Sequence, residues 1–162
     1  MSELSPSPSA VKRAASTFAI VASKYNPEYV QGLVNHAAAE FRARAPSANL
    51  VFHQVPGAFE IPIIVRELAR QDSADAIVAI GVILKGHTDH AEHLARSVTD
   101  SLQRIALEHS VPVIHCVLSV ENEAQARERC LEGRINRGTE AARAAIDIAN
   151  VMLALRREPS HG

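Results

Sequence analysis

This 162-residue chain has little cysteine and few aromatic residues, and each shortage excludes a class of protein. Its two cysteines, Cys116 and Cys130, are too few for a disulfide framework, so we expect a reducing, cytoplasmic compartment. Tryptophan is absent, and aromatic residues make up 4 % of the chain. Aliphatic side chains and 27 alanines must therefore build the core, which favours closely packed helices.

An excess of charge of one sign is also missing. Seventeen Lys+Arg face 18 Asp+Glu, for a formal net charge of −1, whereas nucleic acids and anionic membranes attract a basic field. No apolar run reaches the ~18–20 residues of a membrane span, and we find no secretory h-region. We therefore expect a small molecule or another protein as the partner, with no nucleic acid and no membrane.

The length fits one domain. Residues 1–15 are polar and contain Pro6 and Pro8, which oppose both a helix and a central strand. We expect a flexible N-terminal tail over residues 1–15, a single domain over residues 16–157 and a flexible C-terminal tail over residues 158–162.

Apolar runs alternate with helical stripes along the chain. The runs predict strands over residues 17–22, 49–55 and 111–119 and within 74–84. Apolar residues at helical spacing, together with helix-breaking residues between them, predict helices over residues 27–44, 62–70, 91–106, 119–131 and 139–155. Thr88 and Ser119 are the expected N-caps of the third and fourth helices. This order predicts an α/β fold, a flavodoxin-like three-layer α/β/α sandwich around a four-stranded, mostly parallel sheet.

Open parallel sheets bind ligands beyond the carboxyl ends of their strands, which selects four segments for a site. These segments are residues 22–26, 55–60, 81–90 and 115–119. In the third, the sequence from Lys85 to Thr88 joins a strand to a helix, and its glycine, hydroxyl and positive charge suit a phosphate. An ordinary capped turn is the alternative.

The chain has eight histidines, and His87, His90 and His93 follow each other at three-residue spacing. On a helix, His90 and His93 share a face, so a zinc site is one interpretation. Because no acidic or cysteine ligand set lies nearby, acid–base use at a strand end is favoured over it.

The segment VPGAFEIP, residues 55–62, combines a glycine, a flat ring and a carboxylate directly after a strand. Gly57 permits a close approach of the backbone, Phe59 offers the ring and Glu60 the acid. Flanking prolines stiffen the segment. The alternative is a turn with one core aromatic and one exposed acid.

Taken together, the chain resembles the 6,7-dimethyl-8-ribityllumazine synthase family over roughly residues 18–152. The resemblance rests on SKYN (23–26), VPGAFEIP (55–62), AIGVILKGHTDH (79–90), ENEAQARER (121–129) and INRGTEAA (135–142). It implies condensation of 5-amino-6-(D-ribitylamino)uracil with 3,4-dihydroxy-2-butanone 4-phosphate, the penultimate step of riboflavin biosynthesis. It implies no metal and no cofactor.

The resemblance also implies residue roles. His90 is the implied general acid/base. The implied contacts of the ribitylaminouracil are Tyr25, Asn26, Ala58, Phe59, Glu60, Val82, Ile83, Leu84 and His115. The implied contacts of the butanone phosphate are His87, Thr88, Arg129 and Arg137.

Four positions depart from the family pattern. His115 stands where a phenylalanine is usual, His87 replaces a small or acidic residue, Ala91 replaces an aromatic residue and Arg137 replaces a lysine. The departures at His115 and Ala91 motivate an alternative function, a catalytically impaired shell-forming or flavin-binding relative.

The resemblance further implies a homopentamer with active sites at the subunit interfaces. It leaves a pentamer, a decamer and a 60-subunit shell open as the final assembly, as well as an association with riboflavin synthase.

Overall fold

The computed structural model describes residues 15–86 and 89–157, and strands alternate with helices in the predicted order. The strands are β1 (Thr17–Ser23), β2 (Asn49–Val55), β3 (Ala76–Leu84) and β4 (Val113–Val120). The helices are α2 (Pro27–Arg44), α3 (Ile61–Gln71), α4 (His90–His109), α5 (Glu123–Cys130) and α6 (Arg137–Arg157), and a short 3-10 helix, η1 (Ala58–Glu60), precedes α3.

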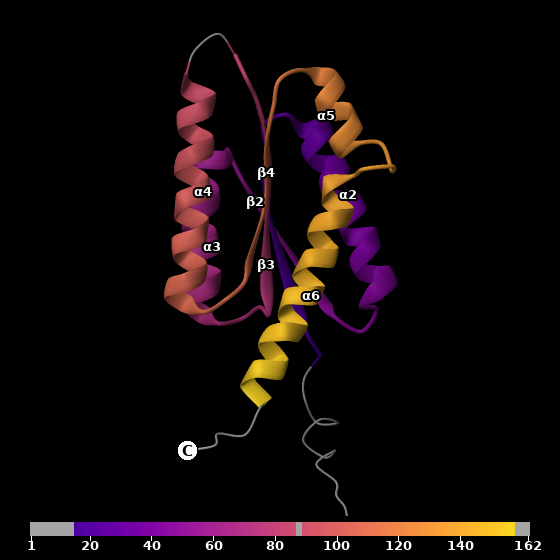
Figure 1. Ribbon diagram of the computed structural model, residues 1–162, viewed down its shortest axis with the longest axis vertical. Coiled ribbons are helices and arrows are strands. Elements are labelled where there is room, and N and C mark those ends of the chain that lie inside the picture. The colour runs from indigo at the N-terminus through magenta and orange to yellow at the C-terminus, as the bar shows by residue number, and fades with distance from the viewer. Residues whose placement is uncertain (1–14, 87–88, 158–162) are drawn as a thin grey trace, which may run out of the picture.

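The four strands of this sheet pair in parallel in the order β2-β1-β3-β4. The central strands β1 and β3 are almost wholly buried because helices cover both faces of the sheet. Seen edge-on in Figure 1, the sheet separates α3 and α4 from α2, α5 and α6. The predicted flavodoxin-like three-layer α/β/α sandwich is therefore confirmed.

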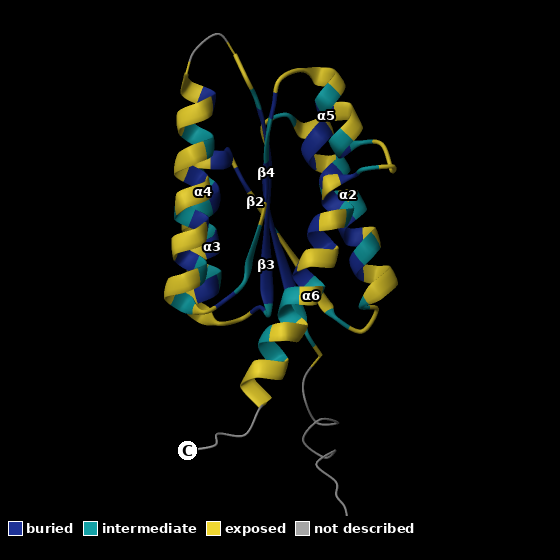
Figure 2. Ribbon diagram, in the orientation of Figure 1, coloured by how far each residue is buried: buried dark blue, intermediate teal, exposed yellow. Residues whose placement is uncertain are grey.

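Each face of the sheet has its own hydrophobic core. On the α2 side, buried alanines such as Ala37, Ala142 and Ala145 let α2 and α6 approach each other closely. On the other side, larger aliphatic residues such as Ile61 and Leu102 fill the space under α3 and α4. Figure 2 shows the buried stripes of the helices turned toward the sheet and their exposed faces turned outward.

A hydrogen bond between side chains ties α5 to α2. The Tyr29 hydroxyl donates to Glu123 Oε1 at 2.6 Å, and this carboxylate raises the pKa of Tyr29. Tyr29 is itself buried under α5. The short helix α5, which is polar along most of its length, thus has a fixed position at one end of the molecule.

Two of the expected helix starts are wrong. Thr88 lies outside the described residues, and the N-cap of α4 is Asp89, whose side chain makes no capping bond. Ser119 belongs to β4, where it pairs with Ile83, so the strand continues past the expected cap. The N-cap of α5 is Asn122, whose side chain accepts a hydrogen bond from the Gln125 amide at 2.9 Å.

Within the part of the chain that the structure describes, no helix is both long and apolar enough to cross a membrane.

Gly138 marks the closest approach between α6 and α2, and it generates a stability prediction. A Cβ at this position would lie 2.3 Å from the Leu33 carbonyl oxygen. We expect Gly138→Ala to lower the free energy of unfolding by about 1–3 kcal/mol, since a backbone atom must move. Urea unfolding followed by circular dichroism measures this.

Gly133→Ala is the matched control, because a Cβ there meets no atom within 4 Å. It should change the free energy of unfolding by less than about 0.5 kcal/mol. Equal losses in the two variants would show that the α2–α6 contact does not require the glycine.

Candidate active site

The carboxyl ends of β1, β2 and β3 meet at one edge of the sheet and bring three predicted segments together. The Lys24 amide donates to the carbonyl oxygens of Val55 and Pro56, at 2.9 and 3.1 Å, which joins the first segment to the second. The Asn26 side chain donates to the Val82 carbonyl oxygen at 2.7 Å, which joins the first to the third. Residues distant in sequence therefore form one continuous surface.

Asn26 takes a backbone conformation that few residues adopt easily. Its φ of 57° and ψ of 56° are left-handed, and it is the N-cap residue of α2. Asparagine tolerates this region better than most residues do. The tight turn and the hydrogen bond to Val82 together place Tyr25 at the edge of the sheet.

The segment from Gly57 to Glu60 faces Tyr25. A Cβ on Gly57 would lie 2.7 Å from a ring carbon of Tyr25, so the close approach anticipated from the sequence is confirmed. The Gly57 amide donates to Glu60 Oε1 at 3.0 Å, which fixes the carboxylate at the start of α3. Ala58 is buried beneath the segment.

Two aromatic rings at this edge are open to solvent. Tyr25 is 68 % exposed and Phe59 is 69 % exposed. The alternative that Phe59 is a core aromatic is therefore wrong. Flat apolar rings left uncovered beside a fixed carboxylate are suited to a planar ligand that also carries hydroxyl groups.

The end of β3 offers backbone groups to the same surface. β3 pairs with β1 only as far as Ile80, whereas it pairs with β4 as far as Leu84. Val82 directs its carbonyl toward Asn26, on the side that β1 no longer occupies. The backbone carbonyls of successive strand residues point to opposite neighbouring strands. The Leu84 carbonyl therefore points to the same side as that of Val82, and the Ile83 carbonyl points toward β4.

His90 is the first residue of α4, is exposed, and follows the loop that leaves β3. His87 and Thr88, two of the predicted phosphate contacts, lie outside the described residues. Lys85 is described: its ammonium pairs with Glu121 Oε1 at 2.6 Å, and this carboxylate raises the pKa of Lys85. No motif or spacing in the sequence indicates this ion pair.

The remaining predicted residues lie elsewhere in the fold. Arg129 is half-buried near the end of α5, and Arg137 is exposed at the start of α6, where it pairs with Glu140 at 2.7 Å. His115 lies within β4 rather than at its carboxyl end, because the strand runs on to Val120. In the described part of the protomer, no hydrogen bond joins these residues to Tyr25 or Glu60.

Among residues 15–86 and 89–157, no three His, Cys, Asp or Glu side chains gather in a group that suits a metal ion. His90 and His93 are both exposed near the start of α4. Their described surroundings supply no third ligand.

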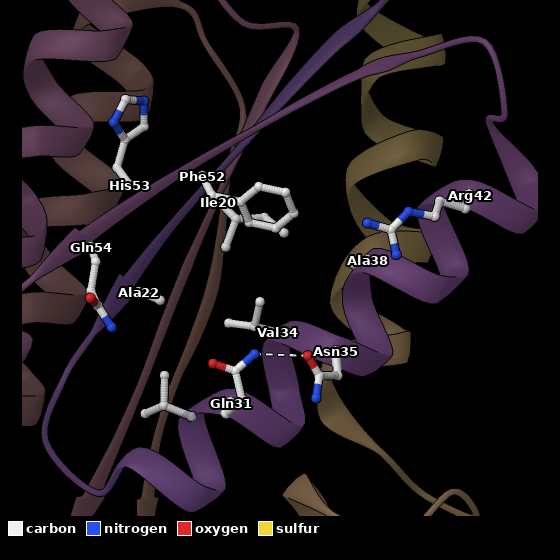
Figure 3. A pocket seen from close by; sticks show the side chains of 11 residues that line it. Ile20, Ala22, Gln31, Val34, Asn35, Ala38, Arg42, Phe52, His53 and Gln54 are labelled. Carbon is white, nitrogen blue, oxygen red and sulfur yellow. Dashed lines mark hydrogen bonds between the residues drawn. The ribbon is translucent and has the colours of Figure 1, made fainter.

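A cavity of about 580 Å³ lies away from the predicted site. It opens between α2 and the edge strand β2, and Phe52, Arg42 and Gln54 are among its lining residues (Figure 3). Two further lining residues, Gln31 and Asn35, hydrogen-bond to each other at 2.8 Å. None of the residues that the sequence assigns to substrate lines this cavity.

Comparison with known proteins connects this geometry to one family. The family model for 6,7-dimethyl-8-ribityllumazine synthase matches residues 15–153. The 6,7-dimethyl-8-ribityllumazine synthase of Leptothrix cholodnii is 38 % identical over 135 residues, which cover 83 % of this chain and 85 % of that protein. Proteins of the same name from Corynebacterium efficiens and Aquifex aeolicus are 39 % and 37 % identical, over 86 % of this chain and 87 % and 91 % of their own lengths.

Asn26 adopts a left-handed backbone conformation and also hydrogen-bonds to the Val82 carbonyl, and two substitutions test these roles separately. Asn26→Gly keeps the left-handed backbone accessible but removes the hydrogen bond to Val82, so we expect a loss of about 1 kcal/mol in the free energy of unfolding. Asn26→Ala removes the bond and also strains the backbone, so the loss should be about 2–3 kcal/mol. Urea unfolding measures both, and equal losses would exclude a backbone requirement at this position.

Proposed function

The chain belongs to the 6,7-dimethyl-8-ribityllumazine synthase family, and from this membership we infer that it condenses 5-amino-6-(D-ribitylamino)uracil with 3,4-dihydroxy-2-butanone 4-phosphate. The products are 6,7-dimethyl-8-ribityllumazine, phosphate and water, in the penultimate step of riboflavin biosynthesis. The observation that carries this function is the family match over residues 15–153, which includes the strand-end surface around Tyr25, Gly57 and Asn26.

In the proposed complex, the pyrimidine lies on the exposed ring of Tyr25, beside Asn26. Ala58 and Phe59 line the adjoining surface, and Glu60 accepts hydrogen bonds from the ribityl hydroxyls. The geometry supports this arrangement because only Oε1 of Glu60 is hydrogen-bonded among the described residues, which leaves Oε2 as an acceptor. The backbone of Val82, Ile83 and Leu84 follows the edge of the pyrimidine.

We propose His90 as the general acid/base. The amine of one substrate attacks the ketone of the other, a first water leaves to give an imine, and phosphate is eliminated. The second amine then attacks the remaining carbonyl and closes the ring with loss of a second water. An imidazole whose ordinary pKa is about 6.5 can both donate and accept protons near neutrality. Holding the two substrates together supplies much of the acceleration, because it replaces a bimolecular encounter.

The phosphate is assigned to His87, Thr88, Arg129 and Arg137. In the described residues the Arg129 guanidinium has neither a hydrogen-bond nor an ion-pair partner, so its charge is available to an anion. Arg137 keeps the positive charge of the usual lysine and adds a planar fork that can bind phosphate through two N–H groups.

At Ala91, the described residues give no support to the catalytically impaired alternative. Ala91, one of the departures that motivated it, is 8 % exposed and packs in the core under α4. A small residue there is accommodated by the core and removes no exposed group from the strand-end surface.

Members of this family work as oligomers, and we propose a homopentamer whose active sites lie between subunits. Support comes from the distribution of the proposed site residues. Arg129 belongs to α5 and Arg137 to α6, and both helices lie on the α2 side of the sheet (Figure 1). Phe59 belongs to η1, which leads into α3 on the other side. A groove of about 460 Å³ between α3 and α4 contains the exposed side chains of Phe59 and Ile63, which a neighbouring subunit would cover.

The remaining parts of the proposal concern the setting of the enzyme. We propose a single domain over residues 16–157, in accord with the family match, and a cytoplasmic location, in accord with two buried free thiols. Riboflavin synthase, which acts on the product, is the protein partner we propose. A pentamer, a decamer and a 60-subunit shell are the alternative final assemblies, which the mass measurement below distinguishes.

The acid/base assignment predicts that His90→Ala lowers kcat by roughly 10²–10⁴-fold. Lumazine formation from the two substrates, followed by absorbance, measures this. His93→Ala is the matched control, since His93 is exposed one turn further along α4 and has no assigned role. Wild-type turnover by His90→Ala would remove His90 from the mechanism, and absence of product with the folded wild-type protein would overturn the proposed function.

Shared sites predict that two impaired variants complement each other. Arg129→Ala should chiefly raise KM for the ketone phosphate, and His90→Ala should lower kcat. Both variants should therefore have low activity at low concentrations of the ketone phosphate. Unfolding and refolding them together should restore about one quarter of the sites, because each site takes one group from each of two neighbours.

The assembly must be measured alongside this complementation. Size-exclusion chromatography with light scattering should give the mass of five 17.5-kDa chains or a multiple of it. A 17.5-kDa species with full activity, or a mixture no more active than its components, would show that one protomer supplies the whole site.

A further inference from the structure

His115 lies on β4 with its side chain on the face that α4 covers. Side chains of a strand alternate between faces, so His115 and Val117 point one way and Cys116 points the other. Val117 packs in the core under α3 and α4, whereas Cys116 packs in the core on the α2 side. His115 itself is exposed, at the rim where α4 crosses β4.

Both ring nitrogens of His115 have partners within the same protomer. The Val117 amide donates to Nδ1 at 3.4 Å, and Nε2 lies 2.8 Å from the Thr99 hydroxyl oxygen. A backbone amide can only donate, so Nδ1 is the acceptor and carries no proton. The proton of a neutral ring is therefore on Nε2, which donates to Thr99 Oγ1.

Burial of part of the ring acts in the same direction. It lowers the pKa of His115 below its ordinary value of 6.5. A second proton on Nδ1 would also face the Val117 amide hydrogen, which the hydrogen bond excludes. Partial burial favours the neutral ring, against a smaller effect of a backbone hydrogen bond that raises the pKa of His115. The bond from the Val117 amide selects the Nε2-protonated tautomer of the neutral ring.

Thr99 can hold the ring because α4 is firmly seated. Its neighbours along the helix, Val98 and Leu102, are 1 % and 2 % exposed in the core beneath. Thr99 is itself exposed and lies next to the strand, so its hydroxyl is fixed relative to β4 by the packing of the helix.

We propose that Thr99 is a positioning residue, which fixes the His115 imidazole in the orientation in which it covers the pyrimidine of the ribitylaminouracil. The inference rests on the proposed function and on the family resemblance, which implies His115 as a contact of this substrate. An untethered imidazole rotates about its χ2 angle and loses that freedom when the substrate binds, whereas a tethered one is already ordered. Two hydrogen bonds thereby let a small polar ring serve where a larger apolar ring is usual.

The hydrogen bond between Thr99 and the His115 ring, which we call the tether, can be tested by kinetics at saturating ketone phosphate. Thr99→Val removes the hydroxyl while keeping the shape, and we expect it to raise KM for the ribitylaminouracil by roughly 2- to 10-fold with kcat nearly unchanged. Thr99→Ser keeps the hydroxyl and should restore the wild-type KM. Gln103→Ala, on the exposed side of α4 one turn further along, controls for general effects on the helix.

A double-mutant comparison separates the tether from any other effect of Thr99. In a His115→Phe background no ring nitrogen remains, so Thr99→Val should cause no further change in KM. An equal rise in KM in both backgrounds would show that Thr99 acts independently of His115. Unchanged KM in Thr99→Val would overturn the inference directly.

Solid-state NMR of protein labelled with ¹⁵N-histidine tests the ring without any enzyme assay. The resonances of His115, identified by their loss in His115→Phe, should report a single Nε2-protonated tautomer in the wild type. In Thr99→Val the Val117 amide still selects this tautomer, and the Nε2 resonance should shift because its hydrogen bond to Thr99 is lost. A wild-type mixture would overturn the tether even if the enzyme is active. If the protein makes no lumazine, the proposed function and the role of His115 in substrate binding are both overturned. A single tautomer in such a protein would still show that Thr99 and Val117 hold the His115 ring.

Discussion

The register in which β3 pairs with β1 on one side and with β4 on the other determines how the strand ends meet at the candidate site. The three strands are parallel, so their carboxyl ends gather at one edge, and β3 extends past the last pair that it makes with β1. That extension brings the Val82 carbonyl to the Asn26 side chain. Because β1 and β3 are buried on both faces, a slip of one residue would exchange the two cores, which holds the register strongly.

Helix packing then places the two groups of site residues on opposite sides of this sheet. Alanines let α6 lie close against α2, and the start of α6 carries Arg137. On the opposite side, larger aliphatic residues hold α3 and α4 against the sheet, and the approaches to these helices carry Phe59 and Glu60. A chain this small separates the two groups by its own sheet, which is why contact between neighbouring copies offers a simple way to unite them.

The fold could be predicted because it depends on local patterns. Buried strands and amphipathic helices can be recognised from the pattern of apolar residues within one segment, and Pro27 marks the start of α2. The helix caps depend on where the chain leaves a strand, so the sequence predicts Ser119 as a cap although β4 incorporates it. Contacts across long sequence separations, such as Lys85 with Glu121 or Thr99 with His115, leave no periodic signal, and only the folded structure reveals them.

The lack of tryptophan gives the two tyrosines a use in spectroscopy. Tyr29 is buried, and its hydroxyl donates to the carboxylate of Glu123, an arrangement that quenches tyrosine emission. Tyr25 is 68 % exposed and stands at the strand-end surface. Tyrosine emission therefore arises chiefly from Tyr25. With no indole to accept its energy, the native chain carries its own fluorescent reporter of the strand-end surface.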